Sequence, residues 1–207
     1  MKSGAALSTV ASSLILSPLT GVWFRAVQTR FLSSALSTAH TASIPSRFLA
    51  NSSAAPGPRV LYLAEDPLIA LYEVQALLGS PFTPGATAPN PRSSWTILNV
   101  NVTLSFVADL TSVPGAQMPL GTTAQELTGD RRGYTHRGAS TSVKAPTGTA
   151  PTQDLGAALY GVSNVQAFRS LSARVPTGQI LIVFVDRLLP GSVSWLNPVT
   201  GITESLP

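Results

Sequence analysis

The amino-acid sequence predicts a single α+β domain built on a mostly antiparallel, split sheet with flanking helices. Segments with strand spacing occur early and late in the 207-residue chain, and the helical patterns fall among them without a regular strand–helix alternation. A regular alternation would have favoured a doubly wound parallel sheet. The sequence also lacks a Gly-x-Gly-x-x-Gly motif and a phosphate-loop lysine motif, which argues against a Rossmann or P-loop nucleotide site.

Composition narrows the classes of function. Hydrophobic residues make up 44% of the chain, enough for one substantial core, while charged residues make up only 11%. The formal net charge of +4 supports weak attraction to phosphate groups rather than a dedicated nucleic-acid surface. There is no cysteine, and neither His40 nor His136 has an acidic partner at a recognisable spacing, so no metal site is predicted. No run approaches the ~20 apolar residues that span a bilayer, and the lack of cysteine fits a cytoplasmic location.

Residues 1–21 are predicted to form an N-terminal helical segment, which is followed by the main domain over residues 22–207. Lys2 and the apolar residues after it loosely resemble a secretory signal. However, serines and a threonine break the apolar stretch, and only residues 14–16 are strongly hydrophobic. We therefore interpret the segment as a first helix that packs on the domain.

The next elements are a strand, an irregular excursion and a second strand. Residues 22–27 have strand character and contain Arg25. The following stretch is rich in Ser, Ala and Pro, and Arg47 followed by Phe48 is its most distinctive pair. Residues 60–64 then form an apolar run of strand length with Tyr62 at its centre.

A helix is predicted to start at Asp66 and Pro67 and to stop at Gly79. The Asp66 side chain can accept free amides of the first turn, and proline already holds a helical φ. Apolar residues recur at helical spacing and leave little polar surface, so Glu73 lies beside or within buried surface. A desolvated carboxylate must be paired, protonated or held for chemistry, whereas a Glu on a narrow solvent strip needs no such role. The sequence leaves both interpretations open.

The clearest strand pattern covers residues 95–106. Val100, Val102, Leu104 and Phe106 alternate with Asn, Thr and Ser residues. This period of two predicts that one face of the strand is buried and the other is solvated.

The second half of the chain predicts shorter elements around a basic loop. A short helix is expected at residues 122–127. The Gly-, Ser- and Thr-rich stretch at about residues 129–151 carries several Arg and Lys residues and is expected to be a mobile basic loop. The remaining predictions are a helix at residues 154–162 and strands at residues 166–170, 180–185 and 192–196.

Four short segments occur in an order that resembles one known family. They are Trp-Phe-Arg at residues 23–25, Arg-Phe at 47–48, Leu-Tyr-Leu-Ala-Glu-Asp-Pro at 61–67 followed by Glu73, and Phe-Arg-Ser-Leu-Ser-Ala-Arg at 168–174. Across about residues 23–186 the chain resembles the RES domain family, whose best-known members are toxins of bacterial RES–Xre toxin–antitoxin pairs. The resemblance implies a fold related to ADP-ribosyltransferases and an activity that consumes NAD as its substrate, with no further cofactor.

The same resemblance implies the site residues. Arg47, Tyr62 and Glu73 fall at the family's arginine, tyrosine and glutamate. Ser172 fits the family's serine better than Ser170 does, although a slip of two residues stays open.

Arg25 matches an arginine near the start of many family members, and we expect it to support the site. The chain also departs from the family pattern. The common Gly-Gly-Arg-Trp-Asn motif is replaced by Pro-Ser-Arg-Phe-Leu at residues 45–49, which removes the flexible glycines before Arg47. The interval from Arg47 to Tyr62 is also longer than in the commonest subtype.

Such a set of residues suits cleavage of the nicotinamide–ribose bond of NAD. Nicotinamide leaves as a neutral group, so the reaction needs negative charge near an oxocarbenium-like ribose rather than a strong acid. We expect Glu73 to supply that charge, and Arg47, with Arg25, to bind the pyrophosphate through its planar donors. Tyr62 is expected to stack on the nicotinamide ring, and the Ser172 hydroxyl to orient the ribose or the amide. Water or inorganic phosphate would then take the ribosyl group.

Three hypotheses from different classes follow. The chain is an NAD-degrading toxin neutralised by an antitoxin, an ADP-ribosyltransferase with a macromolecular acceptor, or a RES-like scaffold that has lost activity and serves as a binding module. The resemblance further implies a homodimer bound by an antitoxin with an Xre-type helix-turn-helix domain. From the composition, we expect no direct contact of this chain with nucleic acid or membrane.

Overall fold

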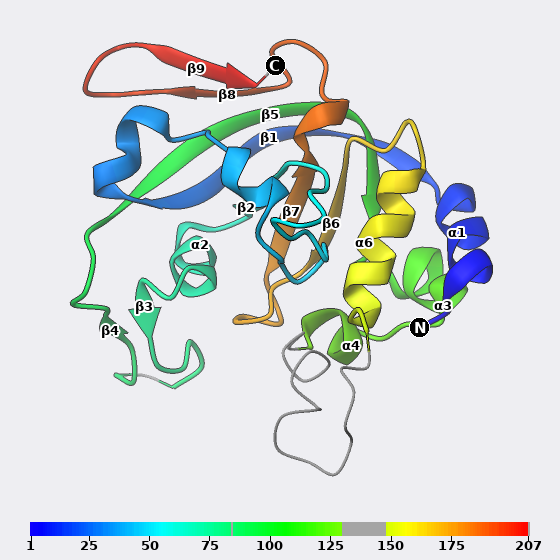
Figure 1. The fold of residues 1–207 in the computed structure, drawn as a ribbon. Coiled ribbons are helices and arrows are strands. Elements are labelled where there is room, and N and C mark those ends of the chain that lie inside the picture. Colours follow the sequence, from blue (N-terminus) through cyan, green and yellow to red (C-terminus); the bar gives the residue numbers. More distant parts are fainter. Residues whose placement is uncertain (84, 130–147, 207) are drawn as a thin grey trace.

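The computed structural model describes residues 1–83, 85–129 and 148–206, and most of their strands form one sheet that closes on itself (Figure 1). The strands of the closed part, in spatial order, are β1 (Leu16–Gln28), β2 (Val60–Ala64), β7 (Gln179–Phe184), β6 (Ala167–Leu171) and β5 (Trp95–Asp109). Because β5 pairs again with β1, these strands make a five-stranded ring. Beyond β5 the sheet continues into β8 (Val193–Leu196) and β9 (Thr203–Leu206).

The α+β class is confirmed, whereas the expected split sheet is not what the described strands form. All neighbouring strands of the large sheet are antiparallel except β5 and β6, which are parallel. The sheet closes because β1 and β5, with 13 and 15 residues, pair along nearly their whole length. Such long twisted strands allow β1 to reach β2 as well, at the single pair Phe24 and Ala64.

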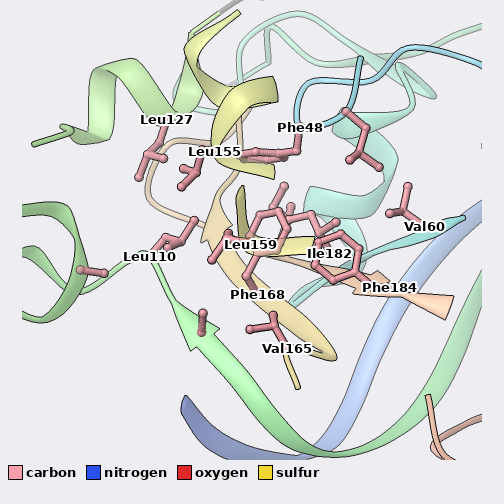
Figure 2. Close-up of a cluster of buried hydrophobic side chains, with 14 of the residues drawn as sticks. Phe48, Val60, Leu110, Leu127, Leu155, Leu159, Val165, Phe168, Ile182 and Phe184 are labelled. Atoms are coloured by element: carbon pink, nitrogen blue, oxygen red, sulfur yellow. The ribbon is translucent and has the colours of Figure 1, made fainter. Parts of the chain in front are cut away.

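Side chains of the ring strands alternate between two apolar clusters, one on each face. One cluster packs beneath α1 (Gly4–Ser13) and α6 (Pro151–Gly161), which lie next to each other in Figure 1. Figure 2 shows its aromatic centre, where Phe48, Phe168 and Phe184 meet side chains of α6. The other cluster contains the alternate residues of the same strands, such as the buried pair Leu61 and Leu63. Both faces of β2 are therefore buried.

The N-terminal helix is shorter than the predicted segment of residues 1–21. Helix α1 ends at Ser13, and the chain is already extended at Leu14, with φ −64° and ψ 141°. From Leu16 onward the backbone pairs with β5, so residues 16–21 belong to β1. These residues include Pro18 and Gly21, which are poor helix formers, so pairing with β5 overrides their weak helical pattern.

The alternation predicted for residues 95–106 holds through Leu104 and is wrong at Phe106, whose side chain is 44% exposed. The side-chain oxygen Oε1 of Gln166 accepts hydrogen bonds from the amides of Ser105 and Phe106, at 2.7 and 3.2 Å. The register with β1 shifts at the same place. This irregularity reverses the phase, so that Val107 is buried instead.

The predicted elements at residues 60–64, 122–127, 154–162, 166–170, 180–185 and 192–196 are present within a few residues, and β9 is an element that the sequence pattern did not predict. The predicted basic loop at residues 129–151 lies almost entirely outside the described residues. The smaller elements are η1 (Thr29–Ser34), η2 (Ala39–Ala42), α2 (Pro67–Glu73), β3 (Leu77–Leu78), β4 (Ala88–Pro89), η3 (Val113–Gln117), α3 (Met118–Leu120), α4 (Ala124–Thr128) and η4 (Val185–Arg187). Across the described ranges, no helix has the length and apolar character needed to cross a membrane.

Candidate active site

Glu73 lies at the C-terminal end of helix α2. The predicted start of this helix is confirmed, because the Asp66 side chain accepts a hydrogen bond of 2.7 Å from the amide of Leu68. The helix ends at Glu73 rather than near Gly79, because Gln75 takes the left-handed conformation with φ 59°. The amide of Gln75 donates to Tyr72 O and the next amide donates to Leu71 O, the pattern that closes many helices with glycine at this position.

The Glu73 carboxylate is held from a distant part of the chain. Its Oε1 atom accepts a hydrogen bond of 2.5 Å from the Ser172 hydroxyl and one of 2.9 Å from the amide of Ala173. Its Oε2 atom accepts no hydrogen bond from any described residue. One oxygen of the carboxylate is therefore fixed by the protein, while the other remains free to interact with a ligand.

Ser172 is fully buried in a tight turn that follows β6. Its Oγ atom accepts hydrogen bonds from the amides of Arg174 and Val175, at 3.1 and 3.0 Å, while donating to Glu73. The backbone amide of Ser172 donates to Gly178 O at 2.8 Å and closes the turn. The serine thus organises its own turn, and the turn presents two donors, the Ser172 hydroxyl and the Ala173 amide, to one carboxylate oxygen.

Ser170, the alternative serine, makes no such contact. It is also fully buried, and its Oγ has no hydrogen-bond partner among the described residues. Of the two serines considered from the sequence, the fold therefore brings Ser172 to Glu73.

Arg47 contacts the start of the same turn. Its Nη2 atom donates a hydrogen bond of 3.0 Å to the carbonyl of Leu171, the residue immediately before Ser172. Burial lowers the pKa of the Arg47 guanidinium from its ordinary value, and the nearby negative charge of Glu73 opposes this shift. The arginine therefore contributes positive charge near the Glu73 carboxylate.

The turn that carries Arg47 is fixed to the start of helix α6. Thr152 Oγ1 donates to Arg47 O at 2.7 Å, and Gln153 Nε2 donates to Ser46 O at 2.9 Å. A Cβ atom on Gly156 would lie 1.8 Å from Phe48 O, so only glycine permits this close approach. Sequence reasoning missed these three α6 residues, since none stands out without the contact that it makes.

Tyr62 lies on β2 and lines the cavity described below. Its hydroxyl donates a hydrogen bond of 2.7 Å to Ser46 Oγ. Burial raises the pKa of Tyr62 above its ordinary value, with the neighbouring Arg47 charge acting in the opposite direction. The phenol therefore stays protonated at neutral pH.

A cavity of about 700 Å³ opens where β1 leaves β2, beyond their single pair at Phe24 and Ala64. This volume falls within the range of about 300–1,000 Å³ that is usual for small-molecule sites. Its lining includes Glu73, Tyr62 and Arg25, whereas Arg47 and Ser172 lie outside it. The predicted residues thus separate into two groups: one lines the cavity, and the other bonds to Glu73 or to the turn that holds it.

Several cavity residues carried no recognisable signal in the sequence. The aromatic ones are Phe24, Phe31 and Trp95, and the polar ones include His40. His40 comes from the irregular excursion, where position along the chain gave no indication of proximity to Tyr62. In the described part of the chain, no group of three His, Asp or Glu side chains is placed to hold a metal ion.

The sequence matches one protein family, and the fold is similar to that of a solved structure. The model of the RES domain matches residues 22–200, so the chain belongs to the RES domain family. No curated protein matches the sequence significantly. Among solved structures, the chain is similar to the MbcT toxin in the crystal structure of the M. tuberculosis MbcT–MbcA toxin–antitoxin complex, with a TM-score of 0.65 and 16% identity over 98% of this chain and 93% of that chain. At this identity the likeness concerns the fold.

Proposed function

We propose that this chain is the cytoplasmic toxin of a toxin–antitoxin system and that it cleaves the nicotinamide–ribose bond of NAD. Membership of the RES domain family and the similarity to MbcT support the toxin assignment. One observation carries the enzymatic proposal. Glu73 lines the cavity, and Ser172 and Ala173 hold its Oε1 atom while its Oε2 atom accepts no hydrogen bond from the described residues.

In the proposed reaction, the bond between ribose C1′ and the nicotinamide nitrogen breaks, and its electron pair stays on the leaving nicotinamide. Glu73 Oε2 faces the positive charge that develops on the ribose, where a fixed carboxylate stabilises the transition state more than the ground state. Because Oε1 is already held by two donors, the carboxylate needs little reorientation during the reaction.

Tyr62 and Arg25 contact the substrate in this proposal, since both line the cavity. The Tyr62 ring packs against the nicotinamide. Arg47 and Ser172 act through Glu73 instead. From the sequence we expected Arg47 to bind pyrophosphate and the Ser172 hydroxyl to orient the substrate. We propose the supporting role instead because neither residue lines the cavity and because Arg47 Nη2 and the Ser172 hydroxyl bond to protein partners, while Arg47 Nη1 has no partner among the described residues.

The ribosyl group would pass to water or to inorganic phosphate. The oxygen of the acceptor bonds to C1′, and the acceptor releases a proton. As a toxin, the chain would be neutralised by a cognate antitoxin with an Xre-type helix-turn-helix domain, and it would form a homodimer. A fold related to that of ADP-ribosyltransferases is part of the same proposal.

The test is to incubate the purified protein with NAD, with and without inorganic phosphate, and to separate the products by chromatography. Nicotinamide with ADP-ribose would identify hydrolysis, and nicotinamide with phosphorylated ADP-ribose would identify phosphorolysis. Label from the ADP-ribosyl group that remains on a macromolecule would instead identify transfer. Intact NAD after incubation with well-folded protein would refute NAD cleavage.

A further inference from the structure

The cavity has an aromatic end at the start of β5. Trp95 and Phe31 belong to its lining, and Gln28, the last residue of β1, faces Trp95 across the β1–β5 pair. The next residue along the chain, Thr29, begins η1, and its amide donates a hydrogen bond of 3.0 Å to Ser94 O. The start of η1, which carries Phe31, is therefore fixed beside the residues that carry Trp95.

This aromatic end is separate from the part of the cavity where Glu73 lies. Glu73 is near Tyr62, because its charge acts on the pKa of the phenol. Phe24 lies at the single pair of β1 with the strand of Tyr62, whereas Gln28 pairs with the first residue of β5. These two residues of β1 are four positions apart on an extended strand, which corresponds to about 13 Å. A dinucleotide carries two base rings joined by riboses and phosphates, so it can occupy both ends at once.

The aromatic side chains at this end suit a planar ring. The Arg30 guanidinium covers one face of the Phe31 ring, with its Cζ atom 4.7 Å from the ring centroid, and the Phe31 side chain is still 52% exposed. The indole Nε1–H of Trp95 is shielded from solvent and has no hydrogen-bond partner among the described residues. A ligand with a ring nitrogen or hydroxyl acceptor would satisfy this donor. Stacking on aromatic side chains is a general way to bind nucleobases.

The side-chain amide of Gln28 adds a directional contact. Arg30 Nε donates a hydrogen bond of 2.8 Å to Gln28 Oε1, which fixes Oε1 as the acceptor and Nε2 as the donor of this amide. Nε2 donates to no described residue, Oε1 keeps a second lone pair, and Gln28 lines the cavity. One donor beside one acceptor matches a ring nitrogen and the exocyclic amine of adenine. Guanine and hypoxanthine carry a carbonyl oxygen in place of that amine, and this oxygen would face the amide oxygen of Gln28.

We propose that Trp95, Phe31 and Gln28 form a subsite for adenine, in which Gln28 rejects purines that have a carbonyl oxygen at the position of the adenine amine. The subsite rests on the proposed function for its role, because the adenine is the second base of the dinucleotide whose nicotinamide end reaches Glu73. It deepens that function by assigning the residue that decides which dinucleotide is accepted.

The experiment measures binding to the intact protein by calorimetry, so it does not depend on turnover. The probes are the monophosphates of adenosine, inosine and guanosine. They share the same ribose and phosphate, so differences in affinity between them report on the base alone. The variants are Gln28→Leu and Phe31→Ala, and Gln125→Leu is the matched control. Gln125 is an exposed glutamine of α4 that lies outside the cavity lining.

The wild type is expected to bind adenosine monophosphate about tenfold more tightly than the other two, because a hydrogen bond is replaced by two facing acceptors. In Gln28→Leu, the affinity for adenosine monophosphate should fall by about tenfold, and the three nucleotides should then agree within about twofold. Phe31→Ala should weaken all three by a similar factor of about fivefold or more, because stacking does not depend on the edge of the base. Gln125→Leu should change no affinity by more than about twofold.

Equal affinities of the wild type for the three nucleotides, or an unchanged preference in Gln28→Leu, would overturn the subsite. Its assignment to the dinucleotide is tested in Glu73→Gln protein, in which we expect NAD to stay intact. NAD should displace adenosine monophosphate there, and a nucleotide that stays bound beside NAD would overturn this assignment. A preference for adenine that depends on Gln28, found without nicotinamide release by the wild type, would support the subsite and count against the enzymatic proposal alone.

Discussion

Replacing Ser172 by alanine tests whether this serine supports Glu73 or contacts the substrate. The Ser172 hydroxyl donates to Glu73 Oε1 at 2.5 Å and accepts from the amides of Arg174 and Val175. A hydrogen bond to a charged group contributes about 1.5–3 kcal/mol, and each neutral bond contributes about 0.5–1.5 kcal/mol. Both amides lie on a partly exposed turn where water can replace the lost acceptor, so we expect the free energy of unfolding to fall by about 2–4 kcal/mol.

The same substitution should reduce the turnover number for NAD. Glu73 would keep the Ala173 amide as its one remaining donor, and the carboxylate would then rotate more freely. A misplaced charge of this kind costs about 1.4–2.7 kcal/mol in the transition state, which corresponds to a fall in kcat of about tenfold to a hundredfold. KM should change little, because the hydroxyl lies outside the cavity lining.

Ser170→Ala is the matched control. Ser170 is equally buried, but its Oγ has no hydrogen-bond partner among the described residues, so alanine should leave stability unchanged or raise it slightly. The assays are denaturant unfolding and the rate of nicotinamide release for both variants. Equal losses in the two variants, or a raised KM with unchanged stability in Ser172→Ala, would refute the supporting role.

Three further predictions follow from the surrounding contacts. Arg47→Met should lower kcat by about tenfold or more and change KM by less than about threefold, because Arg47 bonds to Leu171 O and lies outside the cavity lining. A kinetic assay in which only KM rises would instead support a role of Arg47 in phosphate binding. Gly156→Ala should lower the free energy of unfolding by about 1–3 kcal/mol, because the new Cβ atom would clash with Phe48 O. In Gly161→Ala the new Cβ meets no atom within 4 Å, so thermal unfolding should not change. Similar effects of both substitutions would contradict the argument that only glycine fits at position 156. Burial raises the pKa of Tyr62. An ultraviolet titration of the four tyrosines should therefore show an ionisation step at a pH above the ordinary tyrosine pKa, and this step should be missing in Tyr62→Phe. A tyrosine in the unfolded chain has a pKa of about 10, so the stability that Tyr62 contributes is fully present below that pH and is lost as the pH rises through its raised pKa. A titration without a step at raised pH would contradict the burial of Tyr62.

Local patterns predicted local elements well. The Asp66 cap and the strand at residues 60–64 were predicted correctly because hydrogen bonding of the first helical turn and apolar runs act within a few residues. The end of helix α2 was predicted wrongly, since Gln75 adopts a conformation that usually requires glycine. Phe106 was placed on the wrong face because Gln166, 60 residues away in the sequence, interrupts the alternation.

Closure of the sheet and assembly of the site depend on contacts between distant residues. Nothing near Glu73 in the sequence indicates that Ser172 and Ala173 will bind its carboxylate. The family resemblance named Glu73 and Ser172 as site residues but did not predict this contact. The chemical type of Arg47 suggested phosphate binding, which stays a prediction, whereas its hydrogen bond to Leu171 O could not be foreseen from the sequence. Residue types in the sequence therefore did not predict which protein groups each of these side chains contacts.

The central claim is that the Glu73 carboxylate in the cavity cleaves NAD. The most direct test compares the initial rate of nicotinamide release by the wild type, Glu73→Gln and Glu65→Gln. Glu65 is an exposed glutamate near the same helix that accepts a hydrogen bond from the amide of Gln179, which a glutamine oxygen can also accept. We predict that Glu73→Gln lowers the rate by about a hundredfold or more while remaining folded, and that Glu65→Gln stays within about twofold of the wild type. A wild-type rate in Glu73→Gln, or no release by folded wild-type protein, would contradict the claim.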